Sequence, residues 1–238
     1  MPGPVDTMSP LPIRVAAAGA VLNGDLTIPA DAHGLVLFAH GSGSSRHSRR
    51  NRAVAEVLVH ARLATLLLDL LMQEEEQTDM ITAELRFDIP LLAGRVAAAI
   101  DWARSHPPTA PLPIGLFGAS TGAAAALIAA ARRPREVRAI VSRGGRPDLA
   151  EGALDLVTTP TLLIVGGRDD VVVELNQQAY TRLGGTRELK IVPGATHLFE
   201  EPGALAEVSR LAADWFVEHL GFPGSRFPGS RVGSEVRR

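Results

Sequence analysis

The sequence predicts an α/β fold with a mostly parallel central sheet, helices on both of its faces and antiparallel strands at its N-terminal end. Short apolar runs alternate with helix-like segments through most of the 238 residues, and the links between them are short. Several runs, of which 35–39 is the first, are apolar at every position, which is typical of parallel strands buried on both faces. We therefore expect one domain over 13–220, between a loose Pro-rich segment at 1–12 and a flexible tail at 221–238.

Eight segments are expected to be strands because they are rich in β-branched and other apolar residues and are bounded by turn-forming residues. The first two are joined by small residues, and Asn23-Gly24 is a turn signal. The later ones are short apolar runs that alternate with helix-like segments. In chain order, the expected strands are 13–18, 20–28, 35–39, 64–69, 113–117, 137–141, 161–165 and 188–192.

The expected helices have apolar residues at helical spacing. In 48–61, for example, Val54, Val57 and Leu58 fall on one face. The run 72–88, which contains Glu74-Glu75-Glu76, is instead expected to be acidic and irregular. The expected helices are 48–61, 89–105, a helix that follows Ser120 and ends near Arg132, 173–184 and 202–220.

The composition excludes several classes of function. The chain has no cysteine, which rules out disulfides, thiolate metal sites and a cysteine nucleophile. Its net charge of −2 creates no field that favours nucleic acid, and the basic cluster at 46–52 is typical of a solvated helix start. No apolar run approaches the roughly 18–20 residues of a membrane span. Residues 1–6 lack the pattern of a signal peptide, so we expect a cytoplasmic protein without membrane partners.

The most specific motif is Gly118-Ala119-Ser120-Thr121-Gly122, which follows an apolar run and precedes an alanine-rich segment. A small-x-Ser-x-small sequence between a strand and a helix is typical of a nucleophile elbow. The serine must occupy a sharp turn, and the two glycines remove side-chain atoms that would collide with the chain there. The new helix also directs its free N–H groups toward the group that the serine attacks. Ser120 is therefore the candidate nucleophile.

A serine nucleophile needs a histidine base and a carboxylate that orients the base. On this architecture the expected chain order is Ser, then Asp or Glu, then His. Asp169 and His197 meet that order, and each follows a predicted strand. We therefore expect Ser120, Asp169 and His197 to form a catalytic triad. Asp170, which would cap the turn or the next helix, and Asp148 are the alternative carboxylates.

The loop His40-Gly41-Ser42-Gly43 leaves a buried strand and is rich in glycine. Backbone N–H groups in such a loop can point at a developing oxyanion without obstruction by side chains. We expect the N–H groups of Ser42 and Thr121 to form the oxyanion hole, with Gly43 as the alternative to Ser42. His40 is expected to brace the loop by hydrogen bonding. A phosphate cradle is the competing interpretation, but the fingerprints for nucleotides are incomplete.

Taken together, these segments resemble the α/β-hydrolase superfamily, in its compact dienelactone-hydrolase-like branch. The resemblance covers roughly 13–220 and implies an α/β-hydrolase fold; without a large insertion in the chain, no large cap domain is expected. Dienelactone hydrolases carry cysteine as the nucleophile, so the serine at position 120 favours a serine carboxylesterase. Some members of the family are joined to a phosphoribosyltransferase domain. The resemblance is carried by the segments 40–43, 118–122, 166–169 and 193–197.

We expect the chain to hydrolyse small carboxylic esters through an acyl-enzyme, without a metal or organic cofactor. Its expected partner is a small-molecule ester. The alternatives are a lactone or thioester hydrolase or an acyltransferase with the same triad, and a non-catalytic binding module on the same scaffold.

Three further features bear on the site and the assembly. The segment 71–88 is either a small cover or an ordinary surface connection. Arg143 or Arg146 could bind a substrate carboxylate, or could pair with Asp148 or Glu151. The two phenylalanines of the tail could dock on the body or on a second subunit, so a homodimer is a candidate assembly.

Overall fold

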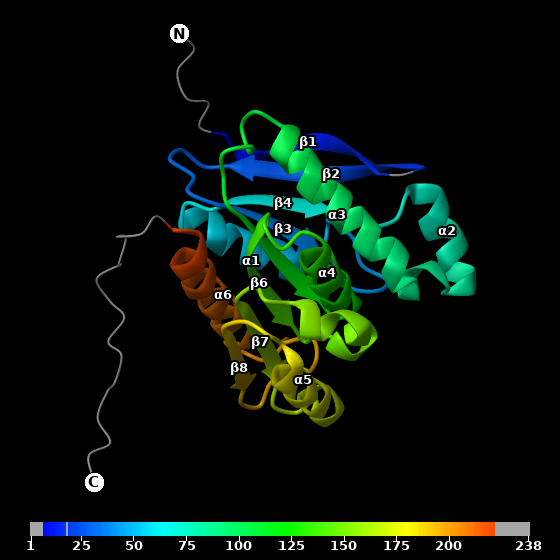
Figure 1. The fold of residues 1–238 in the computed structure, drawn as a ribbon, viewed down its shortest axis with the longest axis vertical. Helices are drawn as coiled ribbons and strands as arrows, with labels where there is room; N and C mark the ends of the chain where they lie inside the picture. The colour runs from blue at the N-terminus through cyan, green and yellow to red at the C-terminus, as the bar shows by residue number, and fades with distance from the viewer. Residues whose placement is uncertain (1–6, 18, 222–238) are drawn as a thin grey trace.

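Figure 1 shows one sheet that runs through the whole molecule, with the N-terminal strands at one edge and β8 at the other. The computed structural model describes residues 7–17 and 19–221, and across these ranges eight strands form the sheet in the order β1-β2-β4-β3-β5-β6-β7-β8. β1 and β2 pair antiparallel with each other, and β2 pairs antiparallel with β4. The remaining pairs are parallel, which confirms the predicted fold class. The strands are β1 (Thr7–Ala17), β2 (Ala20–Ile28), β3 (Leu35–Ala39), β4 (Ala64–Leu68), β5 (Ile114–Ala119), β6 (Val137–Arg143), β7 (Thr161–Gly166) and β8 (Arg187–Val192).

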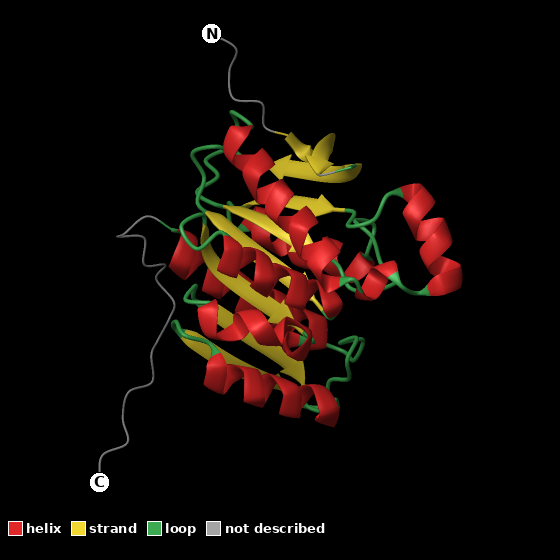
Figure 2. Cartoon of the chain, turned by 45° about the vertical axis from the view of Figure 1, so that its right-hand side comes forward, coloured by secondary structure: helices red, strands yellow, loops and turns green. Residues whose placement is uncertain are grey.

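Helices cover both faces of this sheet (Figure 2). They are α1 (Arg49–His60), α3 (Ile89–Ser105), α4 (Thr121–Arg132), the 3-10 segment η2 (Pro147–Leu156), α5 (Asp170–Arg182) and α6 (Ala204–Leu220). α3, α4, η2 and α5 lie on one face, and α1 and α6 lie on the other. Alternate residues of a strand therefore enter different cores: Leu35 and Leu37 pack into the first, and Val36 and Phe38 into the second.

The first turns of α4 pack directly on the sheet because their side chains are small. The four consecutive residues Ala123, Ala124, Ala125 and Ala126 are fully buried. A helix with such a surface can approach its neighbours more closely than one with branched side chains. Ser120 lies between the end of β5 and the start of α4, so this packing sets the position of the candidate nucleophile.

The N-terminal strands correct two expectations. The sequence predicts a turn at Asn23-Gly24, but both residues lie inside β2, where Gly24 pairs with Ile13. A Cβ atom on this glycine would lie 2.9 Å from the Cδ1 atoms of Ile13 and Leu66, so its role is to make room for packing rather than to reverse the chain. β1 also begins earlier than expected, so residues 7–12 are strand rather than loose.

The acidic run 72–88 is also a correction, because it is largely helical. α2 (Gln73–Thr82) and the short 3-10 segment η1 (Leu85–Phe87) occupy it. Figures 1 and 2 show α2 projecting from the layers of the fold. η2 fills a stretch for which the sequence predicts no element, and α5 begins at Asp170, before the expected start of that helix.

Residues 1–6 and 222–238 lie outside the described residues, and so does nearly all of the expected tail. Within 7–17 and 19–221, no helix is both long enough and apolar enough to cross a membrane.

Candidate active site

Ser120 has the strained backbone that a nucleophile elbow requires. Its φ of 50° and ψ of −120° place it outside the regions that L-residues usually occupy. A Cβ atom on Gly118 would lie 2.8 Å from the backbone nitrogen of Ala123, and closer still to its Cα. A Cβ atom on Gly122 would lie 2.7 Å from the carbonyl carbon of Ala39. Both glycines are therefore required by the close approach of neighbouring backbone, as the motif predicts.

The end of β6 and the turn after it form hydrogen bonds with both the N–H and the carbonyl of Ser120. The Ser120 N–H donates to the Arg143 carbonyl at 3.2 Å, and the Arg146 N–H donates to the Ser120 carbonyl at 3.1 Å. Between them, Gly144 has a φ of 50°, and a Cβ atom there would lie 3.5 Å from two atoms of the His197 ring. The ring of His197 therefore lies against the same short turn that holds Ser120.

Asp169 is hydrogen bonded to His197. The His197 Nδ1 and the Asp169 Oδ2 are 2.6 Å apart, and both side chains are partly buried. With its Nδ1–H donated to the carboxylate, His197 keeps Nε2 as a proton acceptor. Of the other two carboxylates considered, Asp148 pairs with Arg146, and Asp170 is the first residue of α5.

The loops that carry Asp169 and His197 fit closely together. The Arg168 N–H donates to the Ala195 carbonyl at 2.9 Å. A Cβ atom on Gly166 would lie 2.5 Å from the same carbonyl oxygen, so only glycine allows this approach. The fit of the two loops explains why residues distant in sequence present their side chains at hydrogen-bonding distance.

The glycine-rich loop lies against the nucleophile. A Cβ atom on Gly41 would lie 3.0 Å from the Cβ of Ser120. The Ser44 N–H donates to the Gly41 carbonyl at 3.3 Å, which closes a turn with Gly43 at a φ of 65°. Ser42 lies in this turn, and Thr121 is the first residue of α4, where a backbone N–H has no partner within the helix itself. The structure thus brings the two expected donor segments to either side of Ser120.

Two contacts from the segment that follows β4 hold this loop in place. His40 is buried; its Nε2 accepts from the Leu70 N–H at 3.0 Å, and its Nδ1 lies 2.9 Å from the Gly41 carbonyl. Burial lowers the pKa of His40, so the ring is neutral and donates Nδ1–H to that carbonyl. The Arg46 N–H donates to the Asp69 carboxylate at 2.8 Å, and the two side chains form an ion pair. His40 therefore has the bracing role that the sequence predicts.

A cavity of about 350 Å³ opens beside Thr121 and the glycine-rich loop. α2 and η1 form its outer wall, so the segment acts as a small cover. The lining residues are His40, Gly41, Ser42, Gly43, Ser44, Ser45, Asp69, Leu70, Leu71, Glu76, Asp79, Met80, Arg86, Leu92 and Thr121.

One ion pair joins the two parts of this cover to each other, and a second attaches the cover to the body. The buried carboxylate of Asp79 accepts from the Arg86 N–H at 3.0 Å and from its Nε at 2.6 Å. Burial alone would raise the pKa of Asp79, but the Arg86 hydrogen bonds outweigh it and lower the pKa. The Arg95 guanidinium on α3 binds the Glu75 carboxylate on α2 at 2.5 and 2.7 Å. None of these four residues carries a sequence signal that identifies it, because the sequence does not show which charged residues the fold brings together.

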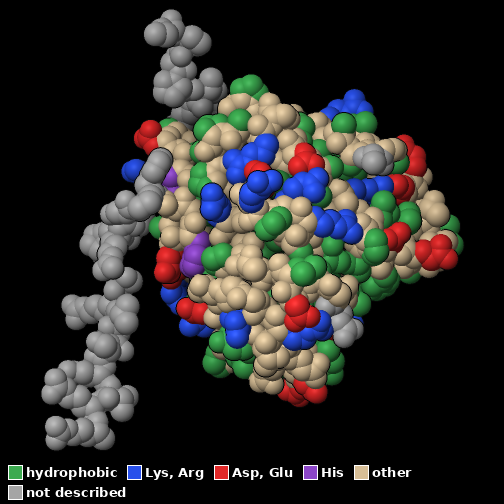
Figure 3. Space-filling view, in the orientation of Figure 1, with side chains coloured by type: hydrophobic (Ala, Val, Ile, Leu, Met, Phe, Trp, Pro, Cys, Tyr) green, Lys and Arg blue, Asp and Glu red, His purple; other side chains and the backbone are tan. Residues whose placement is uncertain are grey.

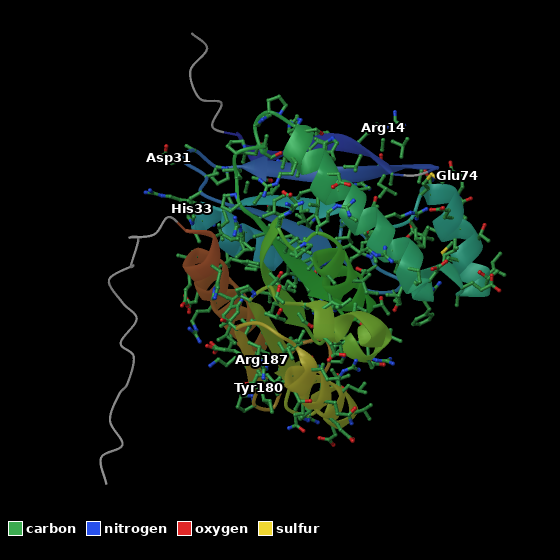
Figure 4. All side chains as sticks on the ribbon, in the orientation of Figure 1. Arg14, Asp31, His33, Glu74, Tyr180 and Arg187 are labelled. Atoms are coloured by element: carbon green, nitrogen blue, oxygen red, sulfur yellow. The ribbon has the colours of Figure 1, made fainter. Side chains whose placement is uncertain are left out.

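The outer surface of α2 is acidic. Figure 3 shows acidic side chains gathered over this projecting end of the molecule. Glu74 lies at the N-terminal end of α2, at the upper right of Figure 4. The outer wall of the cavity therefore exposes acidic side chains together with the apolar side chains of Met80 and Ile81.

The two arginines after β6 have different environments. The Arg146 guanidinium donates two hydrogen bonds to Asp148, at 2.9 and 2.7 Å, which is the structural pairing considered above. The Arg143 side chain is buried, contacts Asn51 and Phe199, and is not among the residues that line the cavity.

One unpredicted residue also supports the site. Asn176 is fully buried in α5, and its Nδ2 donates to the Gly145 carbonyl at 3.0 Å. It thereby fixes the turn that contacts both Ser120 and His197. Nothing in the sequence separates this asparagine from the other polar residues of the helix.

Comparison with known proteins agrees with this geometry. Residues 36–219 match the dienelactone hydrolase family. A protein found in two strains of Mycobacterium tuberculosis, whose name proposes a phosphoribosyl transferase, is 56% identical over 227 residues. The match covers 93% of this chain but 50% of that protein, so the chain spans about half the length of the curated relatives it matches.

Solved structures show the same fold. Dienelactone hydrolase from Anabaena variabilis is 56% identical, with a TM-score of 0.87 over 89% of this chain and 98% of that one. Est1E from Butyrivibrio proteoclasticus has a TM-score of 0.74 at 18% identity, over 88% of this chain and 98% of its own. An esterase from Pyrococcus furiosus has a TM-score of 0.71 at 16% identity, over 90% of this chain and 92% of that one. These two distant structures show only that the fold is shared. The sheet, the elbow and the family match over most of the sequence lead to one conclusion: this chain has the α/β-hydrolase fold and belongs to the dienelactone hydrolase family.

Proposed function

We propose that the chain is a serine hydrolase that cleaves small carboxylic esters through an acyl-enzyme intermediate. The observation that carries this proposal is the His197–Asp169 hydrogen bond, which lies beside a strained serine on a nucleophile elbow. The ring of His197 and the backbone of Ser120 contact one short turn, which supports a mechanism in which Nε2 takes the proton of Oγ.

The reaction follows from these positions. Ser120 Oγ attacks the ester carbonyl carbon while His197 Nε2 accepts the hydroxyl proton. The oxyanion of the tetrahedral intermediate accepts hydrogen bonds from the N–H groups of Ser42 and Thr121, with Gly43 as the alternative to Ser42. Collapse of the intermediate breaks the bond to the leaving oxygen, which takes the proton from His197.

Water completes the cycle. It loses a proton to His197 Nε2 and attacks the acyl carbon, and collapse of the second intermediate releases the acid and returns the proton to Ser120 Oγ. Asp169 keeps the proton on Nδ1 and stabilises the charged ring in both halves of the reaction. No step of this scheme uses a metal or an organic cofactor.

The cavity supports a preference for small substrates. Its volume is about 350 Å³, and its outer wall is a short helix fastened by ion pairs rather than a large apolar cap. Three serines and several charged residues line it together with Leu70, Leu71, Met80 and Leu92, and its limited volume favours short acyl groups over long alkyl chains.

Lactone hydrolysis is the second candidate, because the Anabaena protein that is 56% identical is named a dienelactone hydrolase. Ring opening uses the same triad and differs only in that the leaving oxygen stays attached to the acyl group. Thioester cleavage, acyl transfer and simple binding remain alternatives on the same scaffold. The transferase activity in the mycobacterial name concerns a protein about twice as long, so we assign none to this chain.

A fluorophosphonate probe tests the proposal directly. The wild-type chain should be labelled at Ser120 and should hydrolyse p-nitrophenyl acetate faster than the octanoate, whereas Ser120→Ala should do neither. Ser105→Ala, which changes an exposed serine at the end of α3, is the matched control and should behave as wild type. Labelling or turnover that survives in Ser120→Ala would reject this mechanism. A panel of lactones and acyl thioesters then identifies the preferred bond.

We also propose a cytoplasmic location, no nucleic-acid or membrane partner, and a homodimer as the assembly to be tested first. Light scattering at several protein concentrations determines the oligomeric state.

A further inference from the structure

Arg143 is a buried cation that pairs with no carboxylate among the residues whose side chains the structure describes. Its residue exposure is 7%, and its Nη2 lies 3.4 Å from the Oδ1 of Asn51, itself buried in α1. Its buried Nε has no hydrogen-bond partner among the described residues. Burial and the nearby positive charge of Arg50 lower the pKa of Arg143 to about 10. Desolvating a guanidinium without neutralising it is unfavourable, so a functional reason for its presence is expected.

The guanidinium faces the turn that carries the candidate base. Its Cζ lies 5.9 Å from the centroid of the Phe199 ring, within the range of a cation–π contact. Phe199 is two residues beyond His197 and is 1% exposed. Its φ of 56° is a conformation that bulky residues rarely adopt. The chain after His197 is therefore held in a strained turn whose side-chain anchor lies under Arg143.

The backbone of Arg143 reaches the other strained residue of the site. Its carbonyl accepts the Ser120 N–H at 3.2 Å, and the pairing of β5 with β6 places Arg143 beside Ala119. Ser120 and Phe199 both have positive φ values, and Arg143 contacts the first through its backbone and the second through its side chain.

The environment of Arg143 disfavours the two roles considered for it from sequence. The Arg143 side chain is buried and packs against Phe199, which disfavours direct contact with a substrate carboxylate. Asp148 is engaged by Arg146, which removes one of its two expected partners.

We propose that Arg143 is a positioning residue for His197: its side chain anchors the turn after His197 through Phe199, while its backbone holds the elbow of Ser120. This inference rests on the proposed function, because it assigns Arg143 to the placement of the base relative to the nucleophile. A displacement of about 1 Å between reacting groups can cost roughly 100-fold in rate. The effect should therefore appear in kcat and in the rate of labelling rather than in KM.

The test compares Arg143→Met and Arg143→Lys with Arg187→Met as the matched control. Arg187 makes the same kind of contact with Tyr180, at 5.1 Å, from the start of β8 at the opposite end of the strand from the His197 loop (Figure 4). Arg143→Met should lower kcat and the labelling rate about 10- to 100-fold with little change in KM. Arg143→Lys keeps a cation over the ring and should recover a large part of the loss. Arg187→Met should match wild type in both rates.

Phe199→Leu completes the test and covers the case in which Arg143→Met fails to fold. It should lower kcat without raising KM, and the Arg143→Met effect should shrink in the Phe199→Leu background, because both act through one contact. A wild-type labelling rate in Arg143→Met overturns the inference. So do additive effects of Arg143→Met and Phe199→Leu on kcat, and so does a loss of kcat that is equal in Arg143→Lys and Arg143→Met. If wild type itself is not labelled at Ser120, the proposed function has failed instead.

Discussion

Replacing Gly122 by alanine tests the steric basis of the elbow. The new Cβ would lie 2.7 Å from the carbonyl carbon of Ala39, whereas carbon atoms pack comfortably at about 3.5 Å or more. The overlap is thus about 0.8 Å. Ala39 ends β3, which is held on both sides by β4 and β5, so the strand cannot move away easily.

The magnitude follows from this overlap. Overpacking of this kind costs up to about 3 kcal/mol, and alanine recovers up to about 1 kcal/mol through its higher helix propensity. The net loss of about 2 kcal/mol corresponds to a melting temperature about 4–8 °C lower for a chain of this size. Because the clash lies beside Ser120, the labelling rate should fall by about 100-fold as well.

Gly94→Ala is the control for this change. Gly94 lies within α3, and a Cβ atom there would have no neighbour within 4 Å. Alanine should therefore stabilise the protein by about 0.5–1 kcal/mol and leave labelling unchanged. Differential scanning fluorimetry and timed fluorophosphonate labelling measure both effects. If Gly122→Ala melts and labels like wild type, the steric account of the elbow is wrong.

Three further predictions concern the residues around the site. Asp169→Asn should lower kcat by about 10⁴-fold, while Asp170→Asn should stay within about twofold of wild type; steady-state kinetics that reverse this order would reassign the carboxylate. The pKa of His40 is lowered in the folded state, so its contribution to the free energy of unfolding should be fully present above pH 6.5. As the pH drops below 6.5, the free energy of unfolding should fall by up to about 1.4 kcal/mol per pH unit. Urea unfolding at pH 7.5 and 5.5 measures this slope, and an equal slope in His40→Asn would exclude His40 as its source. Asp79→Asn should loosen α2 by removing the ionic bond to Arg86, so proteolysis within 72–88 should accelerate while Ser120 labelling persists; unchanged cleavage would argue against the fastening role.

The sequence predicts the fold and the candidate triad because their signals are local. The fully apolar runs identify strands buried on both faces, and the glycines of the elbow mark places where backbone meets backbone. Asp169 and His197 become candidates because each follows a strand, and parallel strands end at one edge of the sheet.

What the sequence cannot predict depends on contacts between distant residues. α2 is acidic; Arg86 of the adjacent η1 pairs with it locally, and its attachment to the body depends on Arg95 of α3. Gly24 has the local signature of a turn, but its neighbours Ile13 and Leu66 require a strand there.

The arginines after β6 show the same limit. Arg143 and Arg146 are both polar residues that follow or end one strand. Only the fold reveals that one enters the core beside Phe199 and the other pairs with Asp148 at the surface.

The placement of α2 also bears on how such a chain can acquire new substrates. The segment 72–88 supplies one side of the cavity beside Thr121 but contributes no strand to the sheet and, apart from Asp79, no buried residue. Its length and composition can therefore diverge while the reacting groups, which come from strand ends, keep their spacing. The proposed function thus predicts that exchange of 72–88 between relatives changes substrate preference while the proposed triad, which lies outside this segment, is retained.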